Sequence, residues 1–344
     1  MALLASSVLA QTSIHSALSG RVVDPSGATV SGVQISLTNR DTNQAMEAAS
    51  GEDGLFTFGR LLPGNYNLTA EKTGFQRLQR EGLQVAVNQV ATLTLNLSVG
   101  EVTTTVNVQG DASPIQTQNA DVSLLIDNTR LRDLPLNGKD FQKLMFLAPG
   151  VGNFRSNNPN SNASVSGSRE ASNNYVIDGV SSNDERETAG LALGASFRQQ
   201  PNVISTEALQ EFRIITSNAD ATFGRGSGAQ VNIVTRSGTN EFHGSAYEYL
   251  RNSALDARDF FNYGPYFDDQ GRAKTPPFRQ NLFGATLGGP LRRNKHFFFA
   301  SYEGFRQRLE TTGSPTVPTA DLVRLFPGDF GRLSRAFYFD QNVV

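Results

Sequence analysis

The sequence from Phe223 to Asn252 decides the fold, and it reads FGRGSGAQVNIVTRSGTNEFHGSAYEYLRN. Related patterns return as NLFGATLGGP from Asn281 to Pro290 and as HFFFASYEGFR from His296 to Arg306. Glycine and aromatic residues are interleaved here at strand spacing, and Asn, Gly and Pro gather where the chain would reverse. This pattern is typical of outer-membrane hairpins, in which aromatics lie at the interfaces and glycine lets neighbouring strands approach closely.

Two of these segments alternate apolar and polar side chains, as the strands of a barrel wall do. One face of the last segment carries Phe298, Ala300 and Tyr302, and the opposite face carries Ser301, Glu303 and Gln307, although Phe297 and Phe299 break the pattern near one end. We therefore expect residues 239–344 to begin an outer-membrane β-barrel, with a long extracellular loop from Asp256 to Phe278. A barrel of about 22 strands with about 10 residues each needs well over ~200 residues in strands alone. The sequence is therefore expected to be an N-terminal fragment with an incomplete barrel.

Composition excludes several classes of protein. The 344 residues carry a net charge of −2 and no cysteine, so nucleic-acid binding by a basic surface, disulfides and thiolate metal sites are not expected. No run of 18 apolar residues is present, which argues against a transmembrane helix. Residues 1–10 end in Val8-Leu9-Ala10, which suits the end of a signal peptide cleaved before Gln11, although the usual basic start is missing. A buried first strand is the alternative.

Residues 15–100 show short alternating runs separated by turn sequences such as DPSG at Asp24–Gly27 and GEDG at Gly51–Gly54. About seven short strands at regular spacing predict an antiparallel β-sandwich. The apolar members of the runs are Val33, Ile35, Leu37, Phe56, Phe58, Tyr66, Leu68, Ala70, Leu83, Val85, Val87, Leu93, Leu95 and Leu97.

Residues 101–238 change character, because strand and helix patterns mix there. Helical spacing is expected at Asn128–Leu134 and Lys139–Leu147, and a loop at Asn153–Asn174. Short strands are expected at Val106–Val108, Val122–Ile126, Asn174–Val180, Glu211–Thr216 and Gln230–Thr235. A small α/β globule with long polar loops fits a plug domain that fills a barrel.

The sequence offers no catalytic constellation, so we expect no enzyme, no cofactor and no metal site. His15, His243 and His296 lie far apart, and GRGSG at Gly224–Gly228 lacks the ending of a phosphate-binding loop. Asp178, Asp184 and Glu185 lie close together and have the chemistry to bind a hard cation, but solvated loop carboxylates explain them more simply.

Long motifs in a fixed order carry a family resemblance. They are LPLNG at Leu134–Gly138, PGV at Pro149–Val151, YVIDGV at Tyr175–Val180, VTRSGTNEFHG at Val234–Gly244, Arg251–Asn252 and GGP at Gly288–Pro290. With these motifs the sequence resembles TonB-dependent outer-membrane receptors, most closely the Oar-like group. Further motifs at Gly20–Gly27, Leu62–Tyr66 and Gly74–Phe75 resemble the carboxypeptidase-regulatory, transthyretin-like sandwich. That superfamily also holds starch-binding modules, so carbohydrate binding is an analogy of fold alone.

The resemblance implies an outer-membrane receptor that imports an extracellular ligand, with its N-terminal domains in the periplasm. The implied partners are a TonB-type energy-coupling protein, outer-membrane lipid and an unknown ligand. An alternative is a surface structural or adhesion protein without transport. The segment EVTTTVNV resembles a TonB box, and a proline-free β-prone stretch can add as a strand to a partner's sheet. An alternative is that it ends the sandwich or begins the plug. Its residues are Glu101, Val102, Thr103, Thr104, Thr105, Val106, Asn107 and Val108.

Overall fold

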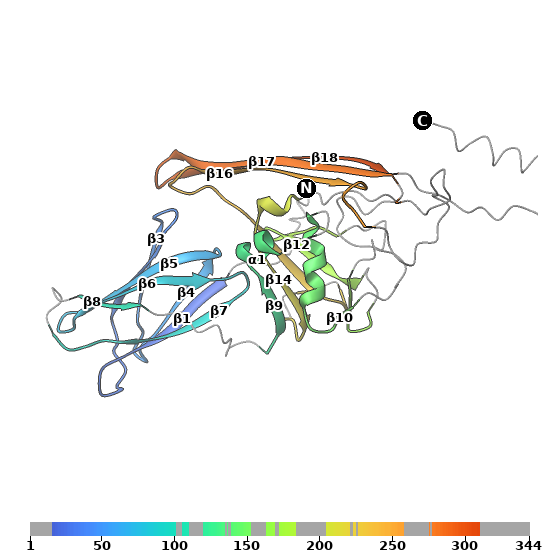
Figure 1. Cartoon of the computed structure of the whole chain (residues 1–344). Helices are drawn as coiled ribbons and strands as arrows, with labels where there is room; N and C mark the ends of the chain where they lie inside the picture. Colours follow the sequence, from blue (N-terminus) through green and yellow to red (C-terminus); the bar gives the residue numbers. More distant parts are fainter. Residues whose placement is uncertain are drawn as a thin grey trace, which may run out of the picture. The chain divides into compact units, whose positions relative to one another are not determined.

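The computed structural model describes residues 16–100, 105–109, 120–134, 136, 139–152, 163–168, 172–183, 204–220, 223–224, 226–257, 275 and 277–309 (Figure 1). It has two compact units, Met1–Glu248 with Leu282–Phe305 and Tyr249–Asn281 with Arg306–Val344. Within the described residues, no helix has the length and apolarity needed to span a membrane.

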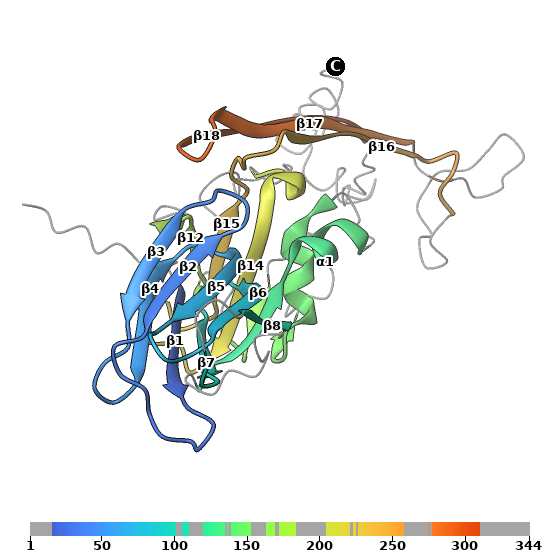
Figure 2. The same cartoon turned by 90° about the vertical axis from the view of Figure 1, so that its left-hand side faces the viewer.

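The N-terminal sandwich consists of two sheets, one with the strand order β4-β1-β7 and one with the order β3-β2-β5-β6-β8 (Figure 2). Its strands are β1 (Ser16–Val23), β2 (Gln34–Asn39), β3 (Ala45–Ala49), β4 (Leu55–Leu61), β5 (Gly64–Glu71), β6 (Arg77–Val85), β7 (Val90–Asn96) and β8 (Thr105–Gln109). The turn before β2 fits the predicted DPSG signal, since the Asp24 carboxylate accepts the backbone N–H groups of Ser26 and Ala28.

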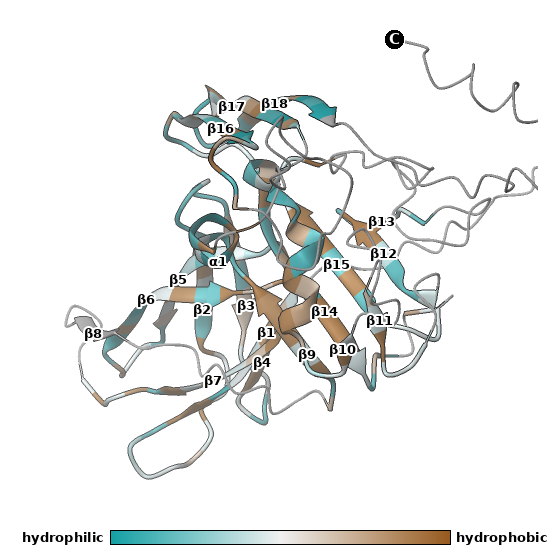
Figure 3. Ribbon diagram, turned by 45° about the vertical axis from the view of Figure 1, so that its right-hand side comes forward, coloured by the Kyte–Doolittle hydropathy of each residue, from teal (hydrophilic) through white to brown (hydrophobic). Residues whose placement is uncertain are grey.

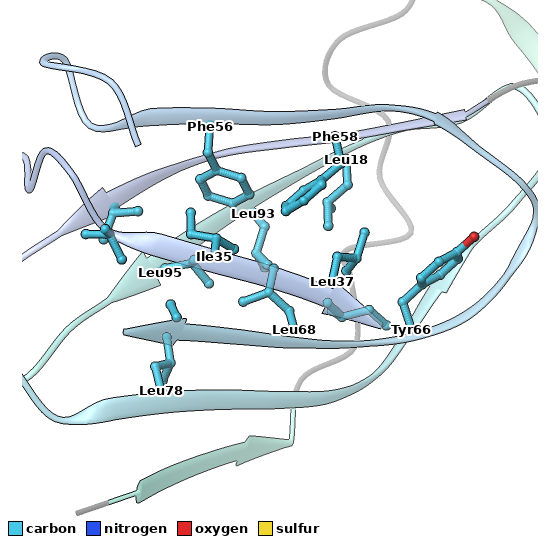
Figure 4. Packing of buried hydrophobic residues seen from close by; sticks show 14 of the residues in the cluster. Leu18, Ile35, Leu37, Phe56, Phe58, Tyr66, Leu68, Leu78, Leu93 and Leu95 are labelled. Atoms are coloured by element: carbon cyan, nitrogen blue, oxygen red, sulfur yellow. The ribbon is translucent and has the colours of Figure 1, made fainter. Parts of the chain in front are cut away.

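Alternating side chains from both sheets form the core of the sandwich, as the sequence predicts. Ile35 and Leu37 of β2 face Phe56 and Phe58 of β4, and these apolar side chains are all buried (Figure 4). Each fully buried Leu, Ile or Phe contributes roughly 1.5–3 kcal/mol relative to exposure, so the alternating side chains stabilise the sandwich. Val87 is also fully buried, but it does not belong to this core.

The prediction of an antiparallel sandwich over residues 15–100 is wrong in one place, and β8, beyond that range, adds a second parallel pair. β1 pairs with β7 in parallel, and β6 pairs with β8 in parallel. The physical reason is that alternation reports which face of a strand is buried, whereas strand direction depends on how distant segments pair.

The central sheet has the order β13-β12-β15-β14-β9. Its strands are β9 (Val122–Ile126), β12 (Asn174–Ile177), β13 (Val180–Ser181), β14 (Leu209–Ser217) and β15 (Gln230–Thr235). These strands are among the most hydrophobic parts of the chain (Figure 3). One sheet face packs against α1 (Asn128–Asp133) and η2 (Phe141–Leu147), where the rings of Phe141 and Phe212 meet edge to face at 5.6 Å.

Four details of this region differ from the sequence prediction. The strand predicted at Asn174–Val180 is two strands, β12 and β13, with a turn at Asp178 and Gly179 between them, because the two strands pair with each other as a hairpin. η2 is a 3₁₀ helix rather than an α-helix, and its N-cap Asp140 accepts the N–H of Gln142. The predicted loop at Asn153–Asn174 contains a short strand, β11 (Ser164–Val165), which pairs with β10 (Val151–Gly152). Most of that loop lies outside the described residues. A third short helix, η4 (Thr206–Ala208), precedes β14 and was not predicted.

The terminal sheet has the order β16-β17-β18, and its strands are β16 (His243–Asn252), β17 (Phe278–Arg292) and β18 (His296–Leu309). These strands are longer than those before them, as expected. Its apolar face pairs Phe242 with Phe298 and Phe283 with Tyr302. Glycine lies under these rings, because a Cβ atom on Gly289 would lie 2.4 Å from the Phe242 ring and one on Gly304 2.5 Å from the Phe283 ring.

In the second unit, the described residues include those that flank the predicted extracellular loop in the sequence. The backbone N–H of Ser253 donates to the Phe278 carbonyl at 2.8 Å, and the Arg251 guanidinium lies 4.9 Å from the centroid of the Phe278 ring. Arg251 also pairs with Asp256 at 3.5 Å. Most of the predicted loop from Asp256 to Phe278 lies outside the described residues.

Candidate functional site: the edge strand and the contacts of the central sheet

The predicted coupling segment lies in the structure as an edge strand. Thr105–Val108 belong to β8, which pairs in parallel with β6 from Arg77↔Thr105 to Glu81↔Gln109. β8 ends the order of its sheet, so its second edge faces no strand among the described residues. The remaining members, Glu101, Val102, Thr103 and Thr104, lie outside the described residues. Thr105–Val108 thus extend the sandwich sheet, and binding of the segment to a partner stays a prediction.

Val87 of the sandwich bonds two side chains of β14, and Gln210 of the same strand donates to the Pro63 carbonyl at 3.2 Å. The backbone N–H of Val87 donates to the Glu211 carboxylate at 2.5 Å, and the Val87 carbonyl accepts from Nε of Arg213 at 2.7 Å. The Val87 side chain packs with Val176 and Val234. Because Glu211 and Arg213 are two positions apart, they project from the same face of the strand.

Burial alters the proton affinity of both charged groups. Burial raises the pKa of Glu211 to about 7, although the Val87 N–H and the positive charge of Arg213 oppose this shift. Burial lowers the pKa of Arg213, and the carboxylates of Asp121 and Glu211 oppose that shift. A guanidinium holds its planar donors in fixed directions, unlike the ammonium group of a lysine. Nη1 of Arg213 also donates to the hydroxyl of Ser123 at 3.0 Å.

Side-chain amides form a buried network at the end of the central sheet. Asn174 donates to Gln230 at 2.6 Å, and Asn173 donates to the Ala163 carbonyl at 2.7 Å and accepts the Ala229 N–H at 3.0 Å. The glycine run that follows Phe223 fits against this network, since a Cβ on Gly228 would lie 2.5 Å from Oδ1 of Asn173. Gly226 and Gly228 therefore allow close packing, since a Cβ on Gly226 would also lie 2.4 Å from the carbonyl oxygen of Ser172.

Of the three acidic residues singled out from the sequence, the structure describes only Asp178. Asp178 has a positive φ of 48°, and its carboxylate accepts the N–H and the hydroxyl of Thr235 at 2.9 and 2.7 Å. Asp184 and Glu185 lie outside the described residues. Among the residues that the structure describes, no group of three His, Asp or Glu side chains could hold a metal ion.

Two of the three histidines, His243 and His296, lie within the described residues. His243 stacks on Phe299 with ring centroids 6.4 Å apart, His296 begins β18, and His15 lies outside the described residues.

One hydroxyl connects the terminal sheet with the segment before β14. The Tyr247 hydroxyl lies 2.9 Å from Oγ of Ser205 and 2.8 Å from a carboxylate oxygen of Glu303. Ser205 is also the N-cap of η4. All three residues belong to the first compact unit.

Sequence reasoning missed the Val87 contact and this tyrosine bridge. A signal for the first is present in β14, where Glu211 and Arg213 alternate with Phe212 and Ile214 in a strand that is otherwise buried on both faces. Charged residues at such positions require partners, and the partner lies more than a hundred residues away in the sequence.

Two family models match the ends of the chain. One is described as a carboxypeptidase regulatory-like domain and covers residues 17–98, and the other as an outer membrane beta barrel domain and covers residues 234–343. The chain is therefore an outer-membrane protein that carries a carboxypeptidase regulatory-like domain, and the expected fold class and outer-membrane localisation are confirmed.

One relative carries the resemblance over most of the chain. The TonB-dependent transporter Oar of Myxococcus xanthus is 29% identical over 313 residues, which are 86% of this chain and 27% of the relative. The resemblance to Oar-like TonB-dependent receptors is thereby confirmed. The chain spans about a quarter of the length of this curated relative.

Two solved structures are similar to parts of the chain. The siderophore receptor PirA of Acinetobacter baumannii is 18% identical, covers 53% of this chain and 24% of its own, and has a TM-score of 0.37. The 5-hydroxyisourate hydrolase of Klebsiella pneumoniae is 25% identical, covers 25% of this chain and 91% of its own, and has a TM-score of 0.21.

Proposed function

We propose that the chain is the N-terminal part of an energy-coupled outer-membrane receptor, which binds an extracellular ligand and imports it without itself catalysing a reaction. The observation that carries this proposal is the two-faced terminal sheet. One face presents Phe242, Phe283 and Tyr302, whereas the other presents Ser245, Tyr247 and Glu303. Long strands of this kind suit a wall between lipid and a polar interior.

In this proposal the sandwich lies in the periplasm, and residues 101–238, which include the central sheet, contain the plug that fills the barrel. The similarity to the Oar transporter over 86% of the chain supports this role.

We propose further that Glu101–Val108 is bound by a TonB-type protein through strand addition. The position of β8 at a sheet edge supports this, because an edge strand offers unpaired backbone groups to a partner. Adjacent residues of a strand point their N–H groups in opposite directions, so prolines at Val106 and Asn107 remove donors from opposite edges of β8.

The test is a pull-down of the full chain with a periplasmic TonB fragment. We expect binding to fall at least about tenfold in Val106→Pro or Asn107→Pro, which corresponds to roughly 1.4 kcal/mol. Val106→Thr is the matched control, since it keeps the N–H and the β-branched side chain, and it should bind as the wild type does. Wild-type binding by both proline variants would assign the segment to structure and favour adhesion without transport.

A further inference from the structure

The contact at Val87 is small and polar compared with the two cores beside it. Only Val87, Val176 and Val234 are buried in its apolar cluster, with Leu125 partly buried against them. Both sides of the contact belong to the first compact unit. An apolar cluster of this size contributes only a few kcal/mol, so the polar groups around it decide whether the contact is tight.

Those polar groups are expensive to bury. Glu211 and Arg213 are 9% and 4% exposed, and each makes a hydrogen bond to Val87. Asn232 of β15 is fully buried, and its amide oxygen and nitrogen have no hydrogen-bond partner among the described residues. Asn232 lies opposite Arg213 in the pairing of β14 with β15. A buried amide without partners costs about 1–3 kcal/mol, which water would recover if the contact opened.

The hydrogen bonds to the backbone of Val87 come from side chains. Both polar backbone groups of one residue are satisfied by side chains of another segment, in place of a backbone ladder. A side-chain carboxylate can change its protonation, whereas a backbone carbonyl cannot, so this arrangement makes the contact sensitive to protons.

We propose that Glu211 and Arg213 form a releasable clamp on Val87, through which proton concentration controls how firmly the N-terminal sandwich is held on the central sheet. The clamp closes when Glu211 is protonated, because a neutral carboxyl group still accepts the Val87 N–H through its carbonyl oxygen and is cheaper to bury than a carboxylate. The clamp loosens when Glu211 loses its proton.

The direction of the pH effect follows from linkage. Burial raises the pKa of Glu211 from 4.5 to about 7, while Arg213 on the same strand opposes the rise and the Asp127 carboxylate adds to it. The closed state therefore binds the proton more tightly than the open state. Closure is favoured most fully below the ordinary glutamate pKa, and this contribution is lost as the pH rises through about 7.

The test is hydrogen–deuterium exchange of the full chain in detergent at pH values from about 5 to 8. The protection factor of the peptide that contains Val87 corrects for the pH dependence of intrinsic exchange. For the wild type we expect protection to fall by at least about tenfold across this range, since one pKa unit corresponds to a tenfold change. Glu211→Gln keeps an oxygen acceptor but cannot titrate, so its protection should be independent of pH.

Two further variants separate the clamp from general loosening. Glu47→Gln changes an exposed carboxylate of β3 and should keep the wild-type profile. Val87→Ala should lower protection at every pH yet retain the pH dependence. Constant wild-type protection, or a Glu211→Gln profile equal to that of the wild type, would overturn the clamp. The wild-type profile decides the question by itself if Glu211→Gln does not fold, and protection of β15 reports on folding in each variant.

Discussion

Tyr247 on β16 donates its hydroxyl hydrogen to Glu303 on β18 at 2.8 Å, across the strand that separates them. Gly284 of the intervening strand, β17, lies beside the tyrosine side chain. A Cβ atom on Gly284 would lie 2.4 Å from the Tyr247 hydroxyl oxygen. The bond therefore depends on a missing side chain in the middle strand. Ser205 completes the arrangement at 2.9 Å from the same oxygen.

Tyr247→Phe removes this hydroxyl while it leaves the ring in place. We expect the free energy of unfolding to fall by about 1–3 kcal/mol, because the lost bonds include one to a carboxylate. Thermal unfolding of the full chain in detergent measures the effect as a lower midpoint. Tyr302→Phe is the control, since Tyr302 is 65% exposed, and its midpoint should not change. Equal midpoints for both variants would mean that the bridge contributes nothing to stability.

Gly228 and Gly224 give a matched pair within one glycine run. An added Cβ at Gly228 would meet Oδ1 of Asn173 at 2.5 Å and the carbonyl oxygen of Ser172 at 2.9 Å, whereas one at Gly224 would meet nothing within 4 Å. We expect Gly228→Ala to destabilise the central sheet by about 1–3 kcal/mol through overpacking. Gly224→Ala should be close to neutral. Denaturation of a chain that ends at Gly238 measures both, and similar losses in the two variants would contradict the packing role of Gly228.

The sandwich is expected to fold by itself, because its core residues all lie between Leu18 and Leu97. A piece ending at Gly100 should unfold in one cooperative transition, and a gradual melt would count against an independent domain. A piece ending at Gln109 adds β8, and we expect it to be more stable by about 1–3 kcal/mol from the added backbone bonds. Equal stability of the two pieces would show that β8 does not pair with β6 in solution.

The terminal sheet should make the 344-residue chain self-associate in water. Phe242 and Leu291 are 70% and 74% exposed, and the open sheet edge invites further pairing. A chain that ends near Gly238 should be soluble and monomeric. Light scattering on both chains makes the comparison. A clean monomer of the full chain without detergent would mean that these strands close on themselves, and the barrel interpretation would fall.

The strands could be predicted from the sequence because each buries one face. Val122–Ile126 and Gln230–Thr235 are strands with the predicted bounds, and the face shared by Phe298 and Tyr302 is the aromatic face of the terminal sheet. The predicted domain limits at Gly100 and Gly238 stay predictions. β8 shows why a limit is difficult to place, since it follows Gly100 in the sequence and joins the sandwich sheet in space.

The long-range contacts could not be predicted from one sequence. Val87 fits the alternation of β6 and was expected in the sandwich core, yet it lies beyond the end of that strand and packs on Val176 and Val234 instead. Alternation says that a side chain is buried, but not against what. The same limit applies to Tyr247 and Glu303, whose partners are set by strand order and by a glycine on the strand between them.

The rings of Phe242 and Phe283, which lie over Gly289 and Gly304, fix the register in which the strands pair. If β17 slipped by two residues, the Phe242 ring would meet Leu287 or Leu291 in place of Gly289, and the two side chains would overlap. A slip by one residue would exchange the faces altogether. The packing of a ring over a glycine therefore allows only one register between neighbouring strands of this sheet.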